Sequence, residues 1–340
     1  DCSQPLTGST FEYDLSFMTD FELSRLDTVP GNPYELLEQR KAFGGKLYRK
    51  LFSPAVDKTW LEYKEKSDFL VLCLRIAPGA GKLEVLPWES LYDGKEFIAA
   101  GARTGLSRLP LDIPWQNDLP PLPLPLQMLA LLSCPLDLEE TERLAIEKEQ
   151  EILLRATNSP AGQGRLKVVF EDEAKLPVIE NTLESDFHIF HYSGHGIDPQ
   201  YGGGLLLEDP SGKRRETRVG EILQTLEKGI KRFRLVVLSG CQTARTLYAS
   251  GFQDLARELA RRKVPAVIAM QFSITDRGGL LFAETLYPRL AEGQPPDLAV
   301  SACRRALLQT DDPMIQADAL APVLFLSSPR PLITKEKESQ

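Results

Sequence analysis

The chain after Leu126 alternates apolar runs of strand length with amphipathic segments of helix length, and this alternation constrains the fold more than any other feature. It predicts strands at 126–133, 166–170, 187–193, 205–208, 234–238, 266–270 and 322–326. It predicts helices at 139–157, 177–184, 219–229, 252–262, 276–291 and 296–309. Strands that alternate with helices of this length form right-handed βαβ units. We therefore predict an α/β fold with a mostly parallel sheet flanked by helices.

A proline-rich stretch separates this region from the first part of the chain. Proline fixes the backbone φ angle and lacks an amide donor, so we expect an extended connector at 110–125. We predict an N-terminal half at 1–109, a C-terminal half at 126–330 and a disordered tail at 331–340. The connector contains six prolines: Pro110, Pro114, Pro120, Pro121, Pro123 and Pro125.

The N-terminal half has a less regular pattern. We expect a strand at 11–17, a helix at 33–52 that contains two consecutive glycines, and short strands at 83–86 and 96–100. Residues 69–76 form a near-continuous apolar run, which is typical of a strand covered on both faces. This half therefore contributes strands of its own.

The charge balance argues against a nucleic-acid or membrane partner. Forty Lys and Arg residues against 48 Asp and Glu give a net charge of −8, and non-specific nucleic-acid affinity depends on neutralising phosphates. No apolar run approaches the roughly 20 residues that span a bilayer. The first residues also lack the basic and apolar regions of a secretory signal.

The cysteines indicate a reducing compartment. Five are scattered along the chain with no Cys-x-x-Cys pair, and a chain of this size needs no disulfide framework. We therefore expect the protein to be cytoplasmic. Because the sequence begins at Asp1 rather than Met, we also expect it to be part of a longer protein.

Two predicted strands end in glycine-rich segments that carry reactive side chains. One is followed by His195 between two glycines, and another by Ser-Gly and then Cys241. Ligands bind beyond the carboxyl ends of strands in open α/β sheets. If the two strands are neighbours, the imidazole of His195 would assist Cys241 in nucleophilic catalysis. Backbone N–H groups of Gly196 and Cys241 would then supply an oxyanion hole.

Each of these residues also has a structural interpretation. A single cysteine is usually a small core residue, and a single histidine is usually a hydrogen-bonded polar group. His188, His191 and His195 have a spacing that suggests a metal site, but the first two would point to opposite faces of a strand. We therefore predict no metal, and we expect His191 to pack beneath the site.

Five segments, in their order along the chain, resemble the CHAT peptidases, a family of caspase-like cysteine proteases. The similarity extends from about residue 10 to 328. The histidine and cysteine motifs read HYSGHG and LSGCQTA. The segments are 86–93, 191–196, 238–244, 267–276 and 299–306.

The resemblance implies a caspase-like fold in which the N-terminal half is a degenerate partner of the catalytic half. It implies that His195 is the catalytic histidine and Cys241 the nucleophile of peptide-bond hydrolysis, with no metal or other cofactor. Asp276 matches an acidic residue that binds a basic P1 side chain in separase-like relatives, with Gln271 in the same pocket. Asp276 could equally belong to the N-cap region of the following helix.

The resemblance also implies the partners. The substrate would be a protein, and a regulatory region outside this chain, such as TPR repeats or a nucleotide- or cyclic-nucleotide-sensing domain, would activate a latent enzyme. Some relatives act in bacterial defence. The alternatives are a catalytically silent scaffold of the same fold and a small-molecule thiol hydrolase with the same dyad.

Overall fold

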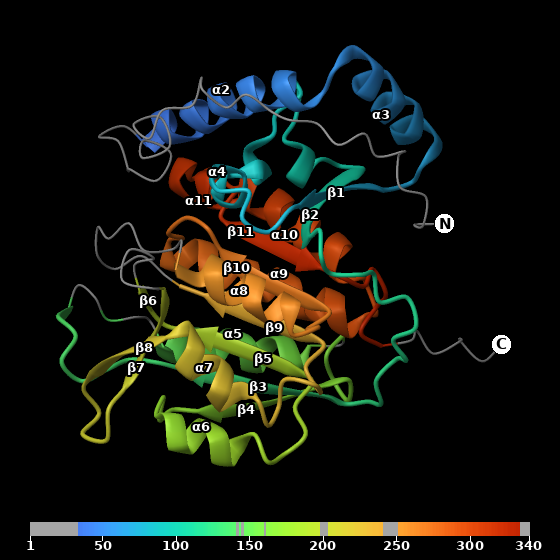
Figure 1. Ribbon diagram of the computed structural model, residues 1–340. Coiled ribbons are helices and arrows are strands. Elements are labelled where there is room, and N and C mark those ends of the chain that lie inside the picture. Colours follow the sequence, from blue (N-terminus) through green and yellow to red (C-terminus); the bar gives the residue numbers. More distant parts are fainter. Residues whose placement is uncertain are drawn as a thin grey trace.

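A computed structural model describes residues 33–140, 143, 146–159, 161–197, 203–240 and 251–333. Its main sheet has eight strands in the order β1-β2-β11-β10-β9-β5-β3-β4 (Figure 1). They are β1 (Leu70–Ile76), β2 (Thr104–Pro110), β3 (Leu126–Leu132), β4 (Leu166–Glu171), β5 (Ile189–Ser193), β9 (Leu235–Ser239), β10 (Ala266–Met270) and β11 (Pro322–Leu326). A smaller sheet joins β6 (Gly196–Ile197), β7 (Gly204–Glu208) and β8 (Arg214–Arg218).

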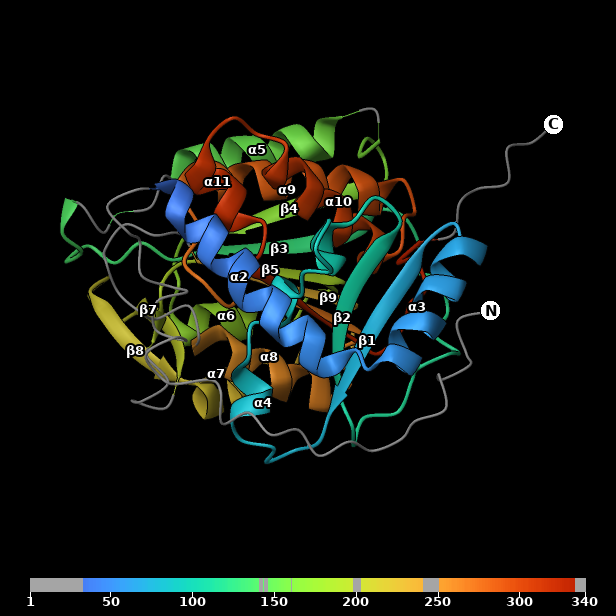
Figure 2. The ribbon, with the colours of Figure 1, turned by 90° about the horizontal axis from the view of Figure 1, so that it is seen from above.

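Helices cover both faces of the main sheet (Figure 2). Helices α5, α9 and α10 pack on one face, and α6, α7 and α8 on the other. The long helices are α2 (Pro33–Leu51), α3 (Pro54–Lys66), α5 (Ile146–Asn158), α8 (Gly251–Arg261), α9 (Asp276–Ala291) and α10 (Pro296–Leu308). The short ones are α4 (Lys82–Val85), α6 (Leu176–Thr182), α7 (Val219–Leu226), α11 (Pro313–Asp318) and two 3₁₀ turns, η1 (Trp88–Ser90) and η2 (Ile98–Ala100).

The main sheet consists of two parallel sets of strands. Strands β10, β9, β5, β3 and β4 run one way, and β11, β2 and β1 run the other, so only the β10–β11 pair is antiparallel. The predicted α/β fold with a mostly parallel sheet is confirmed. The carboxyl ends of β3, β5, β9 and β10 therefore lie along one edge of the sheet, where ligands of such folds bind.

The N-terminal half differs from its predicted pattern. The expected strand at 83–86 is helix α4, the one at 96–100 contains the turn η2, and β2 was not predicted. Among the described strands β1 is the last of the sheet, and six of its seven residues are half-buried, so it is less covered there than its apolar run predicted. The expected strand at 11–17 lies outside the described residues.

A buried ion pair fastens β2 to the rest of the molecule. The guanidinium of Arg108 is 2% exposed and the carboxylate of Glu89, on η1, is fully buried. Arg108 donates from Nε to Glu89 Oε1 at 3.1 Å and from Nη2 to Gln271 Oε1, just after β10, at 2.9 Å. Because an unpaired charge in the interior is costly, these partners have to stay together.

A second buried arginine makes its contacts with backbone carbonyls. Arg304 of α10 donates to the carbonyl oxygens of Ala99 and Leu106, each at 3.2 Å, and of Pro322 at 2.7 Å. Burial lowers the pKa of its guanidinium to about 10. Arg304 therefore joins η2, β2 and β11 to α10.

The first residue of the predicted connector, Pro110, is the last residue of β2, and residues 111–125 contain neither helix nor strand. The connector runs beside the segment that follows β11: Gln116 N donates to the carbonyl of Ser327 at 2.7 Å, and Leu122 N to that of Leu332 at 3.1 Å. The division of the chain into two halves at this connector stays a prediction.

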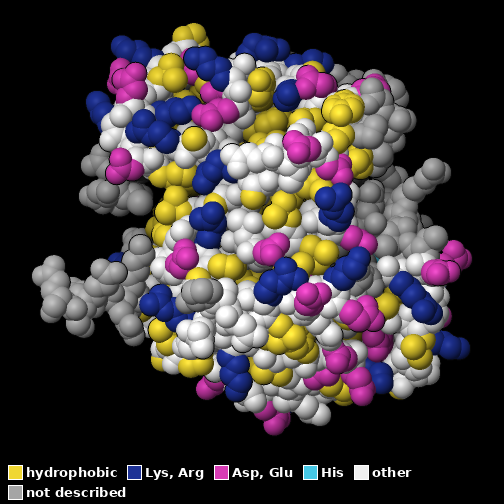
Figure 3. All heavy atoms as spheres, turned by 180° about the vertical axis from the view of Figure 1, so that it is seen from behind, with side chains coloured by type: hydrophobic (Ala, Val, Ile, Leu, Met, Phe, Trp, Pro, Cys, Tyr) yellow, Lys and Arg dark blue, Asp and Glu magenta, His cyan; other side chains and the backbone are white. Residues whose placement is uncertain are grey.

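Acidic and basic side chains are interspersed on the face opposite the view of Figure 1 (Figure 3). None of the described helices is both long and apolar enough to cross a membrane.

Candidate active site

The two strands that lead into the candidate catalytic residues are neighbours. Strands β5 and β9 pair in parallel, with Ser193 opposite Ser239. The pairing continues past the strands, because Gly194 N donates to the carbonyl of Ser239 at 3.2 Å. The chain therefore leaves β5 and β9 at the same point of the sheet edge, so the two strands are the neighbours that the proposed Cys/His arrangement requires.

Both exits need glycine because other groups lie where a side chain would begin. A Cβ atom on Gly194 would lie 2.1 Å from the hydroxyl oxygen of Tyr192. One on Gly240 would lie 2.4 Å from Phe252 of α8 and 3.2 Å from the carbonyl oxygen of Gly194. These distances are shorter than van der Waals contact, so the glycines allow the two exits to approach each other.

His195 lies directly at this junction and is partly buried. Its carbonyl oxygen accepts hydrogen bonds from the Tyr192 hydroxyl and from Leu206 N, both at 2.9 Å. Gly196 follows as the first residue of β6, paired with Leu205 of β7. The backbone of His195 is thus held from β5 and from β7.

Cys241 lies outside the described residues, as do residues 242–250. The last described residue before it is Gly240, which lies beside Gly194. The role of Cys241 as a nucleophile, and of its N–H and that of Gly196 as an oxyanion hole, stays a prediction.

A buried carboxylate lies beneath the junction. Glu149 of α5, 7% exposed, accepts a short hydrogen bond from the hydroxyl of Ser193. Its other oxygen is 2.9 Å from Nε2 of His191, whose Nδ1 is 2.6 Å from the hydroxyl of Tyr287 on α9. Burial, reinforced by the Glu149 charge, raises the pKa of Tyr287. The network joins the last residues of β5 to α5 and α9, which lie on one face of the sheet.

The sequence analysis did not identify Glu149, although a signal for it exists. In α5 the buried positions are Glu149, Ile152, Leu153, Ala156 and Thr157. Glu149 therefore occupies the apolar stripe of its helix at the i, i+3, i+4 spacing. An acidic residue at such a position needs a buried partner, and the nearby histidine motif offered one.

The other two histidines are engaged within the fold. His188 Nδ1 accepts a hydrogen bond from Gln127 N at 3.1 Å. His191 packs beneath the site, in the network with Glu149. Within the described ranges, no group of three His, Cys, Asp or Glu residues is arranged to hold a metal ion.

Asp276 is the first residue of α9, at the same sheet edge as His195. The N-cap is its neighbour Thr275, whose hydroxyl accepts from Gly278 N at 3.0 Å. Thr275 in turn donates from its hydroxyl, at 2.6 Å, and from its N–H, at 3.1 Å, to Oδ2 of Asp318. Burial raises the pKa of Asp318 to about 7. Asp276 thus adjoins the cap without being the cap itself.

Gln271, the other predicted pocket residue, is 5% exposed. Its amide nitrogen donates to the Glu89 carboxylate at 2.8 Å and to the carbonyl of Leu320 at 2.7 Å, and its oxygen accepts from Arg108. Both polar atoms of the side chain are therefore used inside the protein.

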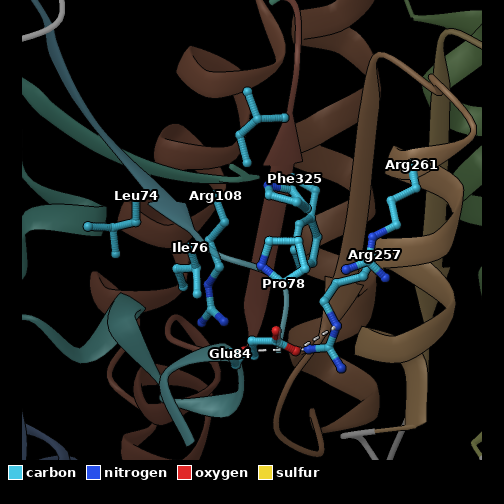
Figure 4. A pocket seen from close by; sticks show the side chains of 10 residues that line it. Leu74, Ile76, Pro78, Glu84, Arg108, Arg257, Arg261 and Phe325 are labelled. Carbon is cyan, nitrogen blue, oxygen red and sulfur yellow. Dashed lines mark hydrogen bonds and ion pairs between the residues drawn. The ribbon is translucent and has the colours of Figure 1, made fainter. Parts of the chain in front are cut away.

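A separate recess lies between β1, β2 and α8 (Figure 4). Its walls include the apolar side chains of Leu74, Ile76 and Phe325, and Arg257 points across it toward Glu84 at 4.0 Å. All of its arginines have carboxylate partners: Arg108 with Glu89, Arg257 with Asp254 and Glu84, and Arg261 with Glu258 and Asp112.

Comparison with known proteins identifies the family. The sequence profile of the CHAT domain matches residues 41–325, which is most of the chain. The protein therefore belongs to the CHAT domain family, and the observed sheet agrees with the caspase-like fold class expected from the motifs. No curated protein matches the sequence.

Several solved structures match this chain at low similarity. The mature and pro-domains of Porphyromonas gingivalis RgpB match with a TM-score of 0.47 and 10% identity, over 88% of this chain and 70% of that one. The Saccharomyces cerevisiae separase–securin complex matches at 0.40 and 17% identity, over 75% of this chain but only 15% of the other. A secreted C11 protease from Bacteroides thetaiotaomicron matches at 0.37 and 11%, over 52% and 56%.

Proposed function

We propose that this chain is a cysteine endopeptidase that cleaves a protein substrate with His195 and Cys241. The observation that carries the proposal is the convergence of β5 and β9, which brings Gly194 and Gly240 together immediately before the two residues. A catalytic dyad needs its base and its nucleophile within hydrogen-bond reach of each other. Two neighbouring parallel strands that end in glycines support such an arrangement.

In the proposed reaction the Cys241 thiolate attacks the carbonyl carbon of the scissile peptide bond. The N–H groups of Gly196 and Cys241 stabilise the developing oxyanion. The C–N bond then breaks, the amine leaves with a proton from the His195 imidazolium, and a thioester remains. Water deprotonated by His195 attacks the thioester, which releases the carboxylic acid and restores the thiol.

We propose a basic P1 side chain, with Asp276 as its partner. Asp276 lies at the sheet edge that carries His195, and the bonds from Thr275 to Asp318 fix the backbone before it. Gln271 supports the segment between β10 and Asp276 from inside the protein, since its side-chain amide is bonded to Glu89 and Arg108. Faster cleavage after acidic or uncharged residues than after Arg or Lys would refute this assignment.

The wider context of the proposal rests on the family. We propose a cytoplasmic enzyme that stays latent until a regulatory region or partner activates it, in a role such as bacterial defence. We also propose that residues 1–109 serve as a degenerate half and 126–330 as the catalytic half.

The test is a paired assay of the protein and Cys241→Ala on a fluorogenic peptide library. Cleavage by the first and none by the second is expected, and His195→Ala should match Cys241→Ala. Cleavage that survives in Cys241→Ala would refute the proposal. A preference for small esters over peptides would favour the small-molecule hydrolase instead.

A thiol-alkylation experiment distinguishes a latent enzyme from a scaffold if neither protein cleaves. Burial raises the pKa of the Cys73 thiol to about 11 and of Cys303 to about 12, so iodoacetamide will spare both at neutral pH. In a Cys2→Ser, Cys134→Ser background, rapid alkylation that is lost in Cys241→Ala indicates an activated nucleophile. Alkylation no faster than that of a free peptide thiol indicates a scaffold.

A further inference from the structure

A second recess lies at the opposite edge of the sheet from the candidate active site. It lies between the amino-terminal ends of β9 and β10, the connector and the segment after β11. Its lining residues include Arg234, Pro296, Ser328 and Arg330. Because β9 begins here and ends at Ser239, the recess is separated from His195 by the length of a strand.

The two arginines of this recess differ from those of the recess in Figure 4. Neither Arg234 nor Arg330 has a carboxylate within ion-pair distance, or a side-chain hydrogen bond, among the described residues. Arg234 is partly buried, and this burial alone lowers the pKa of its guanidinium, with no carboxylate to offset it. Two uncompensated positive charges therefore line one small space.

A buried hydroxyl in the same recess also lacks a partner. Ser328 is 3% exposed, and no described group makes a hydrogen bond with its Oγ. A buried hydroxyl without a hydrogen bond costs about 1–3 kcal/mol, so such a donor gains from an acceptor that binds beside it. Ser328, Arg234 and Arg330 all line this recess.

The start of α10 adds to the positive potential. Pro296 is the first residue of this 13-residue helix and lines the recess, and the N-terminus of a helix attracts negative charge. The neighbouring acid, Asp297, does not line the recess, and its carboxylate accepts a hydrogen bond from Leu298 N at 2.8 Å. None of the described residues that line the recess is acidic, so Arg234 and Arg330 have no carboxylate partner there.

We propose that this recess binds an oxyanion, a phosphate or carboxylate group, between the guanidinium groups of Arg234 and Arg330 with the Ser328 hydroxyl as a third donor. Planar guanidinium groups match both oxyanions in charge and in fork geometry. The site is remote from the sheet edge of His195, so it is not a substrate subsite of the proposed peptidase.

Thermal unfolding in increasing sodium phosphate tests this site, with sodium chloride holding the ionic strength constant. A ligand that binds only the folded state raises the Tm in a saturable way. Sodium acetate in a parallel series shows whether the site takes carboxylates as well as phosphate. We expect Arg234→Gln and Arg330→Gln each to raise the apparent Kd about tenfold, and Ser328→Ala about threefold.

Arg218→Gln is the matched control, because Arg218 is an exposed arginine at the end of β8. It should leave the apparent Kd for phosphate unchanged. Should Arg234→Gln fail to fold, the exposed Arg330 still provides the test. An equal rise in Tm from chloride alone, or an unchanged Kd in Arg330→Gln and Ser328→Ala, would overturn the proposal.

Discussion

Glu89 and Glu149 are both buried carboxylates near the same sheet edge, but their partners differ. Glu89 is paired with the guanidinium of Arg108, which stays charged at every accessible pH. Glu149 is held by the imidazole of His191 and the hydroxyl of Ser193. The first pair joins the N-terminal strands to the sheet, and the second supports the segment that leads into His195.

The two carboxylates therefore stabilise the structure in different ways. A fixed ion pair in the interior is costly to break, because the remaining charge has no compensation. Single hydrogen bonds can be lost one at a time, each at a smaller cost. We therefore predict that loss of the Glu89–Arg108 pair disrupts the junction of the two halves cooperatively. Loss of one hydrogen bond of Glu149 should loosen only the segment that leads into His195.

The largest expected effect is that of Glu89→Leu. It leaves the Arg108 charge buried and unpaired, so the free energy of unfolding should fall by about 3–5 kcal/mol in urea denaturation. The double variant Glu89→Leu, Arg108→Met removes both charges and should recover most of this loss. A single variant that loses less than about 1 kcal/mol would show that the pair is not the fastening described here.

Two adjacent glycines of α2 test how closely this helix packs on the turn that carries Glu89. A Cβ on Gly44 would lie 1.6 Å from the carbonyl oxygen of Ser90, whereas one on Gly45 meets only the end of the Arg49 side chain, at 3.6 Å. Gly44→Ala should therefore destabilise the protein by about 1–3 kcal/mol. Gly45→Ala should stabilise it by about 0.5–1 kcal/mol. Equal effects in thermal unfolding would contradict this packing.

Glu149→Gln keeps the shape of the side chain and removes its charge. We expect a loss of about 1–3 kcal/mol in the free energy of unfolding, because one of its two donors is left without a matching acceptor. Hydrogen exchange should quicken at the amides of residues 193–197. Glu89→Gln serves as the control, and similar exchange at those amides in both variants would remove the distinction between the two carboxylates.

The last expected effect is a change in pH dependence. The pKa of Asp318 is about 7 in the folded protein because of burial, so the folded state takes up a proton there as pH falls. Stability should therefore decrease as pH rises from about 4 to about 7, by at most about 1.4 kcal/mol per pH unit. Asp318→Asn should flatten this slope in denaturation curves taken at several pH values. Asp297, with a pKa raised to about 6, supplies a residual slope, and an unchanged total slope would argue against the burial of Asp318.

Most of the C-terminal half was predictable because local pattern and tertiary role agree there, whereas β8 and α11 were not predicted. Strands such as β5 and β9 are apolar throughout and lie in the centre of the sheet, so their composition reflects their environment. In β1 and α4 the two disagree. The apolar run of β1 lies at an edge, and its half-buried side chains follow from a topology that local periodicity does not encode.

The candidate site was predictable only in part for a similar reason. Glycine motifs identify the strand exits, since close approach leaves a trace in the sequence at Gly194 and Gly240. Contacts between residues far apart in the chain leave a weaker signal in the sequence. The pairing of Glu149 with His191, or of Asp318 with Thr275, joins elements far apart in the chain, and only the folded structure brings them together.

The order of strands in the sheet has a consequence for how the protein is made. In the described sheet, β1 and β2 reach the other strands through β11, which is the last strand along the chain. Synthesis proceeds from the N-terminus, and pairing between distant strands is slow. The apolar run of β1 therefore leaves the ribosome long before β11 exists to anchor its neighbour. The N-terminal strands are the first to be made and the last to find their place.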